Sequence, residues 1–127
     1  MTGAGGDGSL HGCAVLVIED EFFQARETRQ TLEQAGAQVI GPFASGDGLE
    51  ALLDRQAVDL ALIDINLGEG PSFDAAYLLR ARGIPFVIVT GYDAAAMPQD
   101  LADVPALAKP VDSARLMMHL NGVIASR

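Results

Sequence analysis

The stretch Asp59–Ile65 (DLALIDI) decides the fold, because it is a short apolar run that carries an aspartate near its end, at position 64. Cys13–Ile18 (CAVLVI) and Pro85–Thr90 (PFVIVT) are short apolar runs of the same kind, rich in β-branched residues. Runs of this length without polar alternation are typical of parallel strands that helices cover on both faces. The three runs therefore predict the centre of a parallel sheet.

Two further segments predict the remaining strands of this sheet. Gln38–Phe43 (QVIGPF) contains Pro42, which has no amide hydrogen for the ladder of an inner strand and therefore indicates an edge position. Val104–Ala108 is short and mainly apolar, and we expect it to form the fifth strand. The predicted sheet thus has five strands.

Segments with a wider apolar spacing lie between these strands and predict five helices. The first helix begins near Phe22 and is expected to stop at Gly36, a natural helix end. The helix over Asp93–Leu101 is expected to be weak, because Pro98 lies inside it and its apolar face is mostly alanine. The other three are expected to run from a cap at Ser45 to Gln56, from Ser72 to Arg82, and onward from a cap at Asp112.

Strands and helices alternate along the chain with short connections, which predicts right-handed crossovers and helices on both faces of a parallel sheet. The expected fold class is α/β, a flavodoxin-like doubly wound five-stranded parallel sheet with five helices, (βα)5. In folds of this kind the ligand binds beyond the carboxyl ends of the strands. Functional residues are therefore expected at the strand ends.

Length and composition fit one globular domain, with 127 residues, of which 50% are hydrophobic and 20% charged. We expect the glycine-rich residues 1–12 to form a flexible leader and residues 13–127 to form the domain. Cys13 is the only cysteine and lies in an apolar run, so we interpret it as a small core residue.

The charge balance excludes several classes of partner. The formal net charge is −9 and the eight basic residues are scattered, which argues against binding to nucleic acid. No apolar stretch approaches the roughly 20 residues of a membrane span, and the N-terminus does not resemble a secretory signal. We therefore expect a cytoplasmic protein without membrane contact. The acidic surplus fits a divalent cation or a basic partner surface, or it serves only solubility.

Polar groups follow the apolar strands at four places. Glu19 and Asp20 come directly after the first strand, Asp64 ends the third, Thr90 ends the fourth, and Lys109 follows the fifth. Because the carboxyl ends of parallel strands meet at one edge of the sheet, we expect these five side chains to gather there. Each alone has an ordinary alternative, a solvated carboxylate, a surface lysine or a hydroxyl that closes a strand.

The chemistry of such a cluster is that of phosphoryl transfer. Gathered carboxylates repel one another unless a cation neutralises them, and Mg²⁺ prefers hard oxygen ligands such as those of Asp20 and Asp64. Phosphoryl transfer needs an in-line nucleophile and fixed positive charge around the transferred oxygens. An aspartate, Mg²⁺ and Lys109 would supply those parts. Thr90 could donate a hydrogen bond to a phosphoryl oxygen, and Gly91 would leave the approach open.

The motifs VLVIEDE, LALIDINLG, VTGYD and ALAKP occur in the order and spacing of response regulator receiver domains (CheY-like), which the chain resembles from about Cys13 to its end. The resemblance implies a phosphorylation-dependent switch of a two-component system, which accepts a phosphoryl group from a sensor histidine kinase or a histidine phosphotransfer protein. Such a domain catalyses only its own phosphotransfer and slow autodephosphorylation. By position, Asp64 is similar to the phosphoacceptor, Glu19 and Asp20 to the acidic pair that holds Mg²⁺, Thr90 to the switch hydroxyl and Lys109 to the phosphoryl-sensing lysine.

Two further features follow from the resemblance. Asn66 matches the residue whose backbone carbonyl completes the metal shell, and the Lys109–Pro110 peptide bond is expected to be cis, which X–Pro bonds adopt at a cost of about 0.5–1 kcal/mol. The pattern departs from the family at Ala106, where most receivers carry an aromatic residue. Tyr92 follows the threonine instead, and VTGYD resembles the single-domain FAT GUY receivers. We therefore expect the readout to involve Thr90, Gly91 and Tyr92.

Two other functions remain open at this stage. A haloacid-dehalogenase-like phosphatase would also use an aspartate, a threonine, a lysine and Mg²⁺, but it needs a second aspartate where Asn66 stands. A receiver-like scaffold that is not phosphorylated would keep the fold and act through binding alone. The chain shows no output domain after the last predicted helix, so any effect is expected to pass through a downstream protein partner.

Overall fold

The central feature of the computed structural model is a five-stranded parallel sheet with the strand order β2-β1-β3-β4-β5. The structure describes residues 9–65, 73–91 and 97–126. The sheet confirms the expected flavodoxin-like doubly wound fold, and β2 and β5 are its edge strands. The strands span β1 Ala14–Ile18, β2 Gln38–Phe43, β3 Leu60–Asp64, β4 Phe86–Thr90 and β5 Ala106–Ala108.

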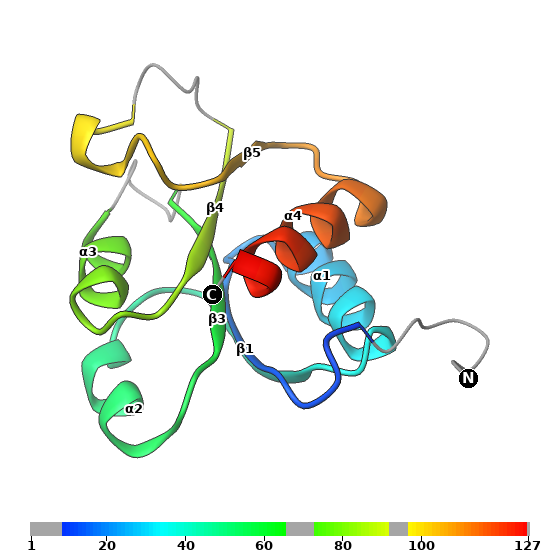
Figure 1. Cartoon of the computed structure of the whole chain (residues 1–127), viewed down its shortest axis with the longest axis horizontal. Helices are drawn as coiled ribbons and strands as arrows, with labels where there is room; N and C mark the ends of the chain where they lie inside the picture. The colour runs from blue at the N-terminus through cyan, green and yellow to red at the C-terminus, as the bar shows by residue number, and fades with distance from the viewer. Residues whose placement is uncertain (1–8, 66–72, 92–96, 127) are drawn as a thin grey trace.

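Helices cover both faces of the sheet (Figure 1). On one face α1 (Phe22–Gln34) and α4 (Ser113–Ser126) lie side by side, and the hydroxyls of Thr31 and Ser113 are 2.9 Å apart. On the other face lie α2 (Leu49–Arg55) and α3 (Asp74–Ala81). This two-sided cover explains why β3 and β4 are apolar along almost their whole length.

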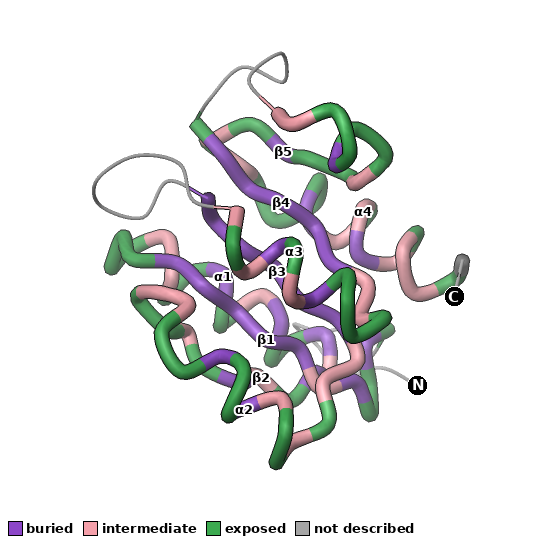
Figure 2. Tube along the Cα trace, turned by 90° about the vertical axis from the view of Figure 1, so that its left-hand side faces the viewer, coloured by how far each residue is buried: buried purple, intermediate pink, exposed green. Residues whose placement is uncertain are grey.

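The core consists of two apolar layers, one on each side of the sheet. Alternate residues of a strand point to opposite faces, so Val15 and Val17 pack beneath α1 and α4, while Leu16 and Ile18 pack beneath α2 and α3. Figure 2 shows β3 and β4 buried along their full length and the surrounding turns mostly exposed. The rigid core fixes where the carboxyl ends of the strands lie.

The expectation of five α-helices is wrong for the part of the chain that the structure describes, which holds four. In place of a helix over Asp93–Leu101, residues 97–103 contain only the short 3-10 helix η2 (Gln99–Leu101), and residues 92–96 lie outside the described residues. Pro98 precedes η2 with an extended ψ of 145°. Because proline lacks an amide hydrogen and a helical ψ is not adopted there, a regular α-helix does not pass through this position.

Two boundaries also differ from the sequence expectation. Leu10 belongs to the expected leader, yet its side chain is fully buried and its amide donates to the carbonyl of Ala35 at 2.9 Å. Packed structure therefore begins before residue 13. The expected cap at Ser45 is also misplaced, because α2 begins after Gly48 at a left-handed φ of 77°, and Ser45 accepts a hydrogen bond from Asp47 instead.

Two glycines hold turns that other residues would strain. Gly36 follows the end of α1 with φ +93°, which confirms it as the expected helix stop. Gly41 has φ +105° at the point where the register between β1 and β2 shifts, and a Cβ there would lie 2.8 Å from the carbonyl oxygen of Val17. Only glycine fits so close an approach between the two strands.

Among the described residues, none of the helices combines the length and the apolar character needed to cross a bilayer.

Candidate functional site

The sheet register brings the polar strand ends to one edge. Ile18 pairs with Ile63, so Glu19 at the end of β1 and Asp64 at the end of β3 are neighbours. Asp64 in turn pairs with Val89, one residue before Thr90. The amide of Lys109 donates to the carbonyl of Thr90 at 2.9 Å, which places the lysine directly after β5. The strand ends that carry these residues therefore lie next to one another, as expected.

Three carboxylates form a cluster at this edge. Glu19, Asp20 and Asp64 each offer a carboxylate oxygen, and these oxygens lie within 4.8 Å of one another. Glu19 and Asp64 are buried, whereas Asp20 is exposed. The cluster thus has two oxygens fixed in the protein and one that faces solvent.

Lys109 lies against the two buried carboxylates. Its Nζ is 2.7 Å from Oδ2 of Asp64 and 3.1 Å from Oε2 of Glu19, and the side chain is 24% exposed. Burial alone would lower the pKa of Lys109, but the hydrogen bonds to Asp64 and Glu19 outweigh burial and raise the pKa above its ordinary value. The lysine therefore stays charged and partly neutralises the cluster.

Glu19 has the most perturbed environment of the cluster. Burial, together with the charge of the Asp64 carboxylate, raises the pKa of Glu19 to about 7, although hydrogen bonds from the Glu21 amide and from Lys109 favour its ionised form. The Glu21 carboxylate accepts from the amide of Gln24 at 2.6 Å and caps α1. The first turn of α1 thus helps to fix the segment Glu19–Glu21. A buried carboxylate with a raised pKa at a strand end is typical of a functional site.

Of the remaining predicted residues, some lie in the described part of the chain and two do not. Thr90 is buried and Gly91 is exposed, both at the end of β4, and the Lys109–Pro110 peptide bond is cis, as expected. Ala106 is exposed and contributes no aromatic ring. The predicted roles of Asn66 and Tyr92 fall on residues that lie outside the described part of the chain.

Comparison with known proteins identifies the family. The family model for the response regulator receiver domain matches residues 15–121. The chain belongs to this family. The phosphatase alternative is thereby disfavoured, and the expected family and fold are confirmed.

Curated relatives of this receiver domain are response regulators and a sensor protein. It is 35% identical over 82 residues to the alginate biosynthesis transcriptional regulatory protein AlgB of Pseudomonas aeruginosa, a match that covers 63% of the chain and 18% of the relative. It is 33% identical over 116 residues to the sensory transduction protein LytR of Streptococcus agalactiae, covering 86% of the chain and 47% of the relative. The chain spans less than half the length of these relatives.

Solved receiver structures share the fold. The solution structure of SdrG from Sphingomonas melonis Fr1 has a TM-score of 0.75 and 29% identity, and the match covers 88% of this chain and 96% of SdrG. The receiver domain of the response regulator TorR has a TM-score of 0.76 at 24% identity, covering 90% and 98% of the two chains. Receiver domains of this kind are generally switches rather than enzymes.

The carboxylate cluster fits the Mg²⁺ that receiver domains bind at an acidic pocket. Its oxygen donors are hard ligands, and Mg²⁺ typically uses one or two protein carboxylates and keeps several waters. Burial, together with the charge of Asp64, raises the pKa of Glu19, and a cation beside these carboxylates would favour the ionised form. Glu19, Asp20 and Asp64 would therefore hold the ion, with the exposed Asp20 at its entrance.

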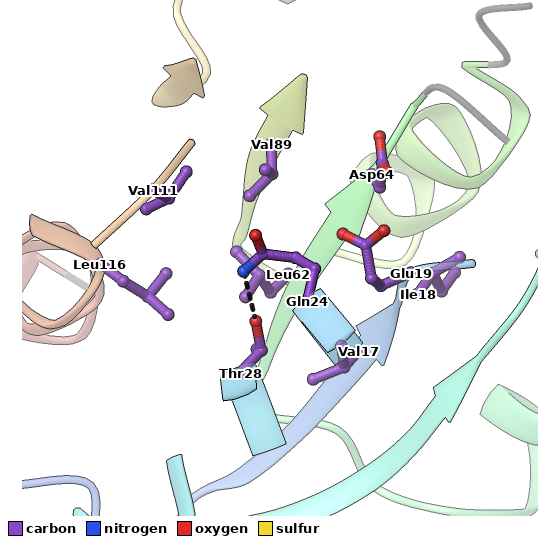
Figure 3. A pocket seen from close by; sticks show the side chains of 10 residues that line it. All are labelled: Val17, Ile18, Glu19, Gln24, Thr28, Leu62, Asp64, Val89, Val111 and Leu116. Carbon is purple, nitrogen blue, oxygen red and sulfur yellow. Dashed lines mark hydrogen bonds between the residues drawn. The ribbon is translucent and has the colours of Figure 1, made fainter. Parts of the chain in front are cut away.

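A small cavity extends from the carboxylates towards α1 and α4 (Figure 3). It measures about 10 Å³, close to the least volume that one water needs. Gln24 lies in its wall and donates to the buried hydroxyl of Thr28 at 3.3 Å. Gln24 belongs to none of the motifs that indicate the site in the sequence. This cavity is too small for an organic substrate. A wider hollow of about 620 Å³ also reaches Asp64, and residues of α2 and α3 line it.

Proposed function

We propose that this receiver domain is a phosphorylation-dependent switch whose acceptor is Asp64. The observation that carries the proposal is the position of the Asp64 carboxylate, which is almost fully buried at the carboxyl edge of the sheet, beside Glu19 and 2.7 Å from the ammonium of Lys109. Receiver domains are phosphorylated by histidine kinases or phosphotransfer proteins. We infer that a phosphohistidine of such a partner is the donor here.

Transfer is an in-line displacement at phosphorus. A carboxylate oxygen of Asp64 forms the new O–P bond while the N–P bond of the phosphohistidine breaks, and the donor imidazole leaves with the bonding electron pair and takes a proton. Mg²⁺, when held by the three carboxylates, supplies positive charge that offsets the repulsion between the acceptor and the incoming phosphoryl oxygens. Glu19 and Asp20 contribute by positioning that charge next to Asp64.

Lys109 would change partners during the reaction. Its ammonium hydrogen-bonds Asp64 before transfer, and the phosphoryl group, with about −1.5 to −2 charge, offers a stronger partner at almost the same place. We infer that Lys109 moves onto a phosphoryl oxygen and that the hydroxyl of Thr90 donates to another. The negative charge added at Asp64 would thus move the residues at the ends of β4 and β5.

The readout would differ from that of receivers with an aromatic residue on the fifth strand, since Ala106 has no ring to turn inward. We propose that the signal leaves the site through Thr90, Gly91 and Tyr92, as in receivers of the FAT GUY type. A downstream protein partner would recognise the altered surface. We place the transfer in the cytoplasm, where ATP-dependent histidine kinases carry their phosphohistidine.

The test is labelling with acetyl phosphate, a small phosphodonor, in the presence of Mg²⁺. We expect a phosphoprotein with one phosphoryl group that hydroxylamine removes, because an acyl phosphate reacts with that nucleophile. Asp64→Asn should abolish the labelling, and EDTA should prevent it. Asp54→Asn is the matched control, because Asp54 is an exposed aspartate of α2 that pairs with Arg82, and this variant should label like the wild type. Labelling of the Asp64→Asn variant at the wild-type level would refute Asp64 as the acceptor, whereas absence of labelling in the wild type would favour the scaffold that is not phosphorylated.

A further inference from the structure

Helix α3 holds the chain that leads from β4 to β5 through two side chains outside the phosphorylation site. The Tyr77 hydroxyl donates to Oδ1 of Asp100 at 2.8 Å. Arg80, one turn further along the helix, donates to the carbonyl oxygen of Asp100 at 2.7 Å and to both carboxylate oxygens of Asp103 at 3.0 and 3.2 Å. We call these contacts of Tyr77 and Arg80 the α3 latch.

The contacts are polar and lie at the surface. The hydrogen bond to Asp100 raises the pKa of Tyr77, and the hydrogen bond from Arg80 lowers the pKa of Asp103. The side chains of Arg80 and Asp103 are 41% and 74% exposed, so each contact can break without exposing an apolar surface. Beneath them, Leu101 anchors η2 in the core with no exposed surface. The latch is thus a set of surface contacts on a segment that Leu101, Met97 and Val104 attach to the core.

The latch lies on the covalent route that leaves the site. Residues 97–103 lead into β5, whose Ala108 pairs with Thr90, and Lys109, the next residue, donates its amide to the carbonyl of Thr90. Figure 1 draws that segment in yellow on the same side of the sheet as α3. A displacement of Thr90 or Lys109 towards a phosphoryl group would therefore act, through β5, on the segment that the latch restrains.

We infer that the α3 latch stabilises the unphosphorylated arrangement and opens when Asp64 is phosphorylated. This inference rests on the proposed function. If the latch contacts exist only before phosphorylation, thermodynamic linkage requires that removing them favours the phosphorylated arrangement and raises affinity for a phosphoryl group at Asp64. The latch would then set how much of the protein is active before any signal arrives.

The experiment measures the affinity for beryllofluoride with Mg²⁺, using the shift of backbone amide NMR signals in the full chain. Beryllofluoride mimics the phosphoryl group of a phosphorylated aspartate. The structure of the relative SdrG has been solved in a conformation described as BeF3-activated. Tyr77→Phe removes one hydroxyl and keeps the ring, and Arg80→Gln removes the guanidinium. We expect the apparent Kd to fall about two- to tenfold in each variant. Amide exchange over residues 97–104 should be faster in both variants before beryllofluoride is added, and in the wild type only after it.

Arg82→Gln is the matched control. Arg82 follows α3 directly and pairs with Asp54 at 2.7 Å, so this change removes an equal charge and a comparable surface ion pair without touching Asp100 or Asp103. Its beryllofluoride affinity should equal that of the wild type. A lower melting temperature in all three variants would show only that surface contacts are lost. A lower Kd for beryllofluoride in Tyr77→Phe and Arg80→Gln alone would show that the latch opposes the phosphorylated arrangement.

The outcomes separate the two proposals. Unchanged or weaker beryllofluoride binding in both latch variants, with Asp64 still labelled by acetyl phosphate, would overturn the latch and leave the proposed function intact. Absence of both labelling and beryllofluoride binding in the wild type would overturn the proposed function, and the latch with it.

Discussion

Replacing Lys109 by methionine removes the ammonium that lies between the carboxylates of Glu19 and Asp64 and keeps most of the aliphatic stem. The side chains of Glu19 and Asp64 are only 5% and 1% exposed, so solvent screens them poorly once the cation is gone. Breaking a buried pair typically costs about 3–5 kcal/mol. Because the Lys109 side chain is itself 24% exposed, we expect the lower end, about 3 kcal/mol of lost unfolding free energy.

The measurement is urea unfolding followed by circular dichroism at pH 8 in EDTA, compared with the same series in excess Mg²⁺. Mg²⁺ should recover part of the lost free energy, because an ion that binds only the folded carboxylates stabilises the folded state. The loss should also shrink below pH 6, where Glu19, with its pKa raised to about 7, takes up a proton and the uncompensated charge falls.

Arg82→Met provides the control for this prediction. The Arg82–Asp54 pair has the same 2.7 Å separation as Lys109–Asp64, but its side chains are 30% and 65% exposed. A surface pair of this kind contributes about 0–1 kcal/mol. If Lys109→Met in EDTA at pH 8 costs no more than Arg82→Met, burial of the two carboxylates does not determine the energetics of this site.

Three further predictions follow from single residues. The unfolding free energy of the metal-free wild type should fall between pH 4.5 and 7 by more than that of Glu19→Gln. Burial raises the pKa of Glu19 in the folded state, so the folded protein binds more protons than the unfolded chain in this pH range. The same pH dependence of unfolding in both proteins would contradict this. Gly41→Ala should destabilise the domain by about 1–3 kcal/mol in urea unfolding, because its Cβ would lie 2.8 Å from the carbonyl of Val17 at a positive φ; a neutral effect would show that the β1–β2 register adapts. Leu10→Ala should cost about 2–4 kcal/mol, since Leu10 is fully buried, and a loss below 0.5 kcal/mol, roughly the scale of surface changes, would mean that the core ends after it.

The sequence predicted most of the sheet because its signals are local. Continuous apolar runs at β1, β3 and β4 and the proline in β2 report burial and edge position directly, and the structure confirms them. The alanine spacing predicted a weak helix over Asp93–Leu101, but Pro98 has an extended ψ, and the residues after it form only the 3-10 helix η2. Leu10 was missed because its glycine-rich neighbours suggested a leader, and only the packing under α1 shows that this leucine completes the core.

The sequence by itself determined which chemical groups stand at the strand ends, since the order of the apolar runs fixes the parallel topology and brings Asp64, Glu19 and Lys109 to one edge. Only the tertiary structure decided which atoms meet. The two contacts of Lys109 at 2.7 and 3.1 Å, and the hold of Tyr77 and Arg80 on Asp100, join residues at least 20 positions apart in the chain. Side-chain contacts over such separations depend on how helices pack on the sheet, and no local pattern records them.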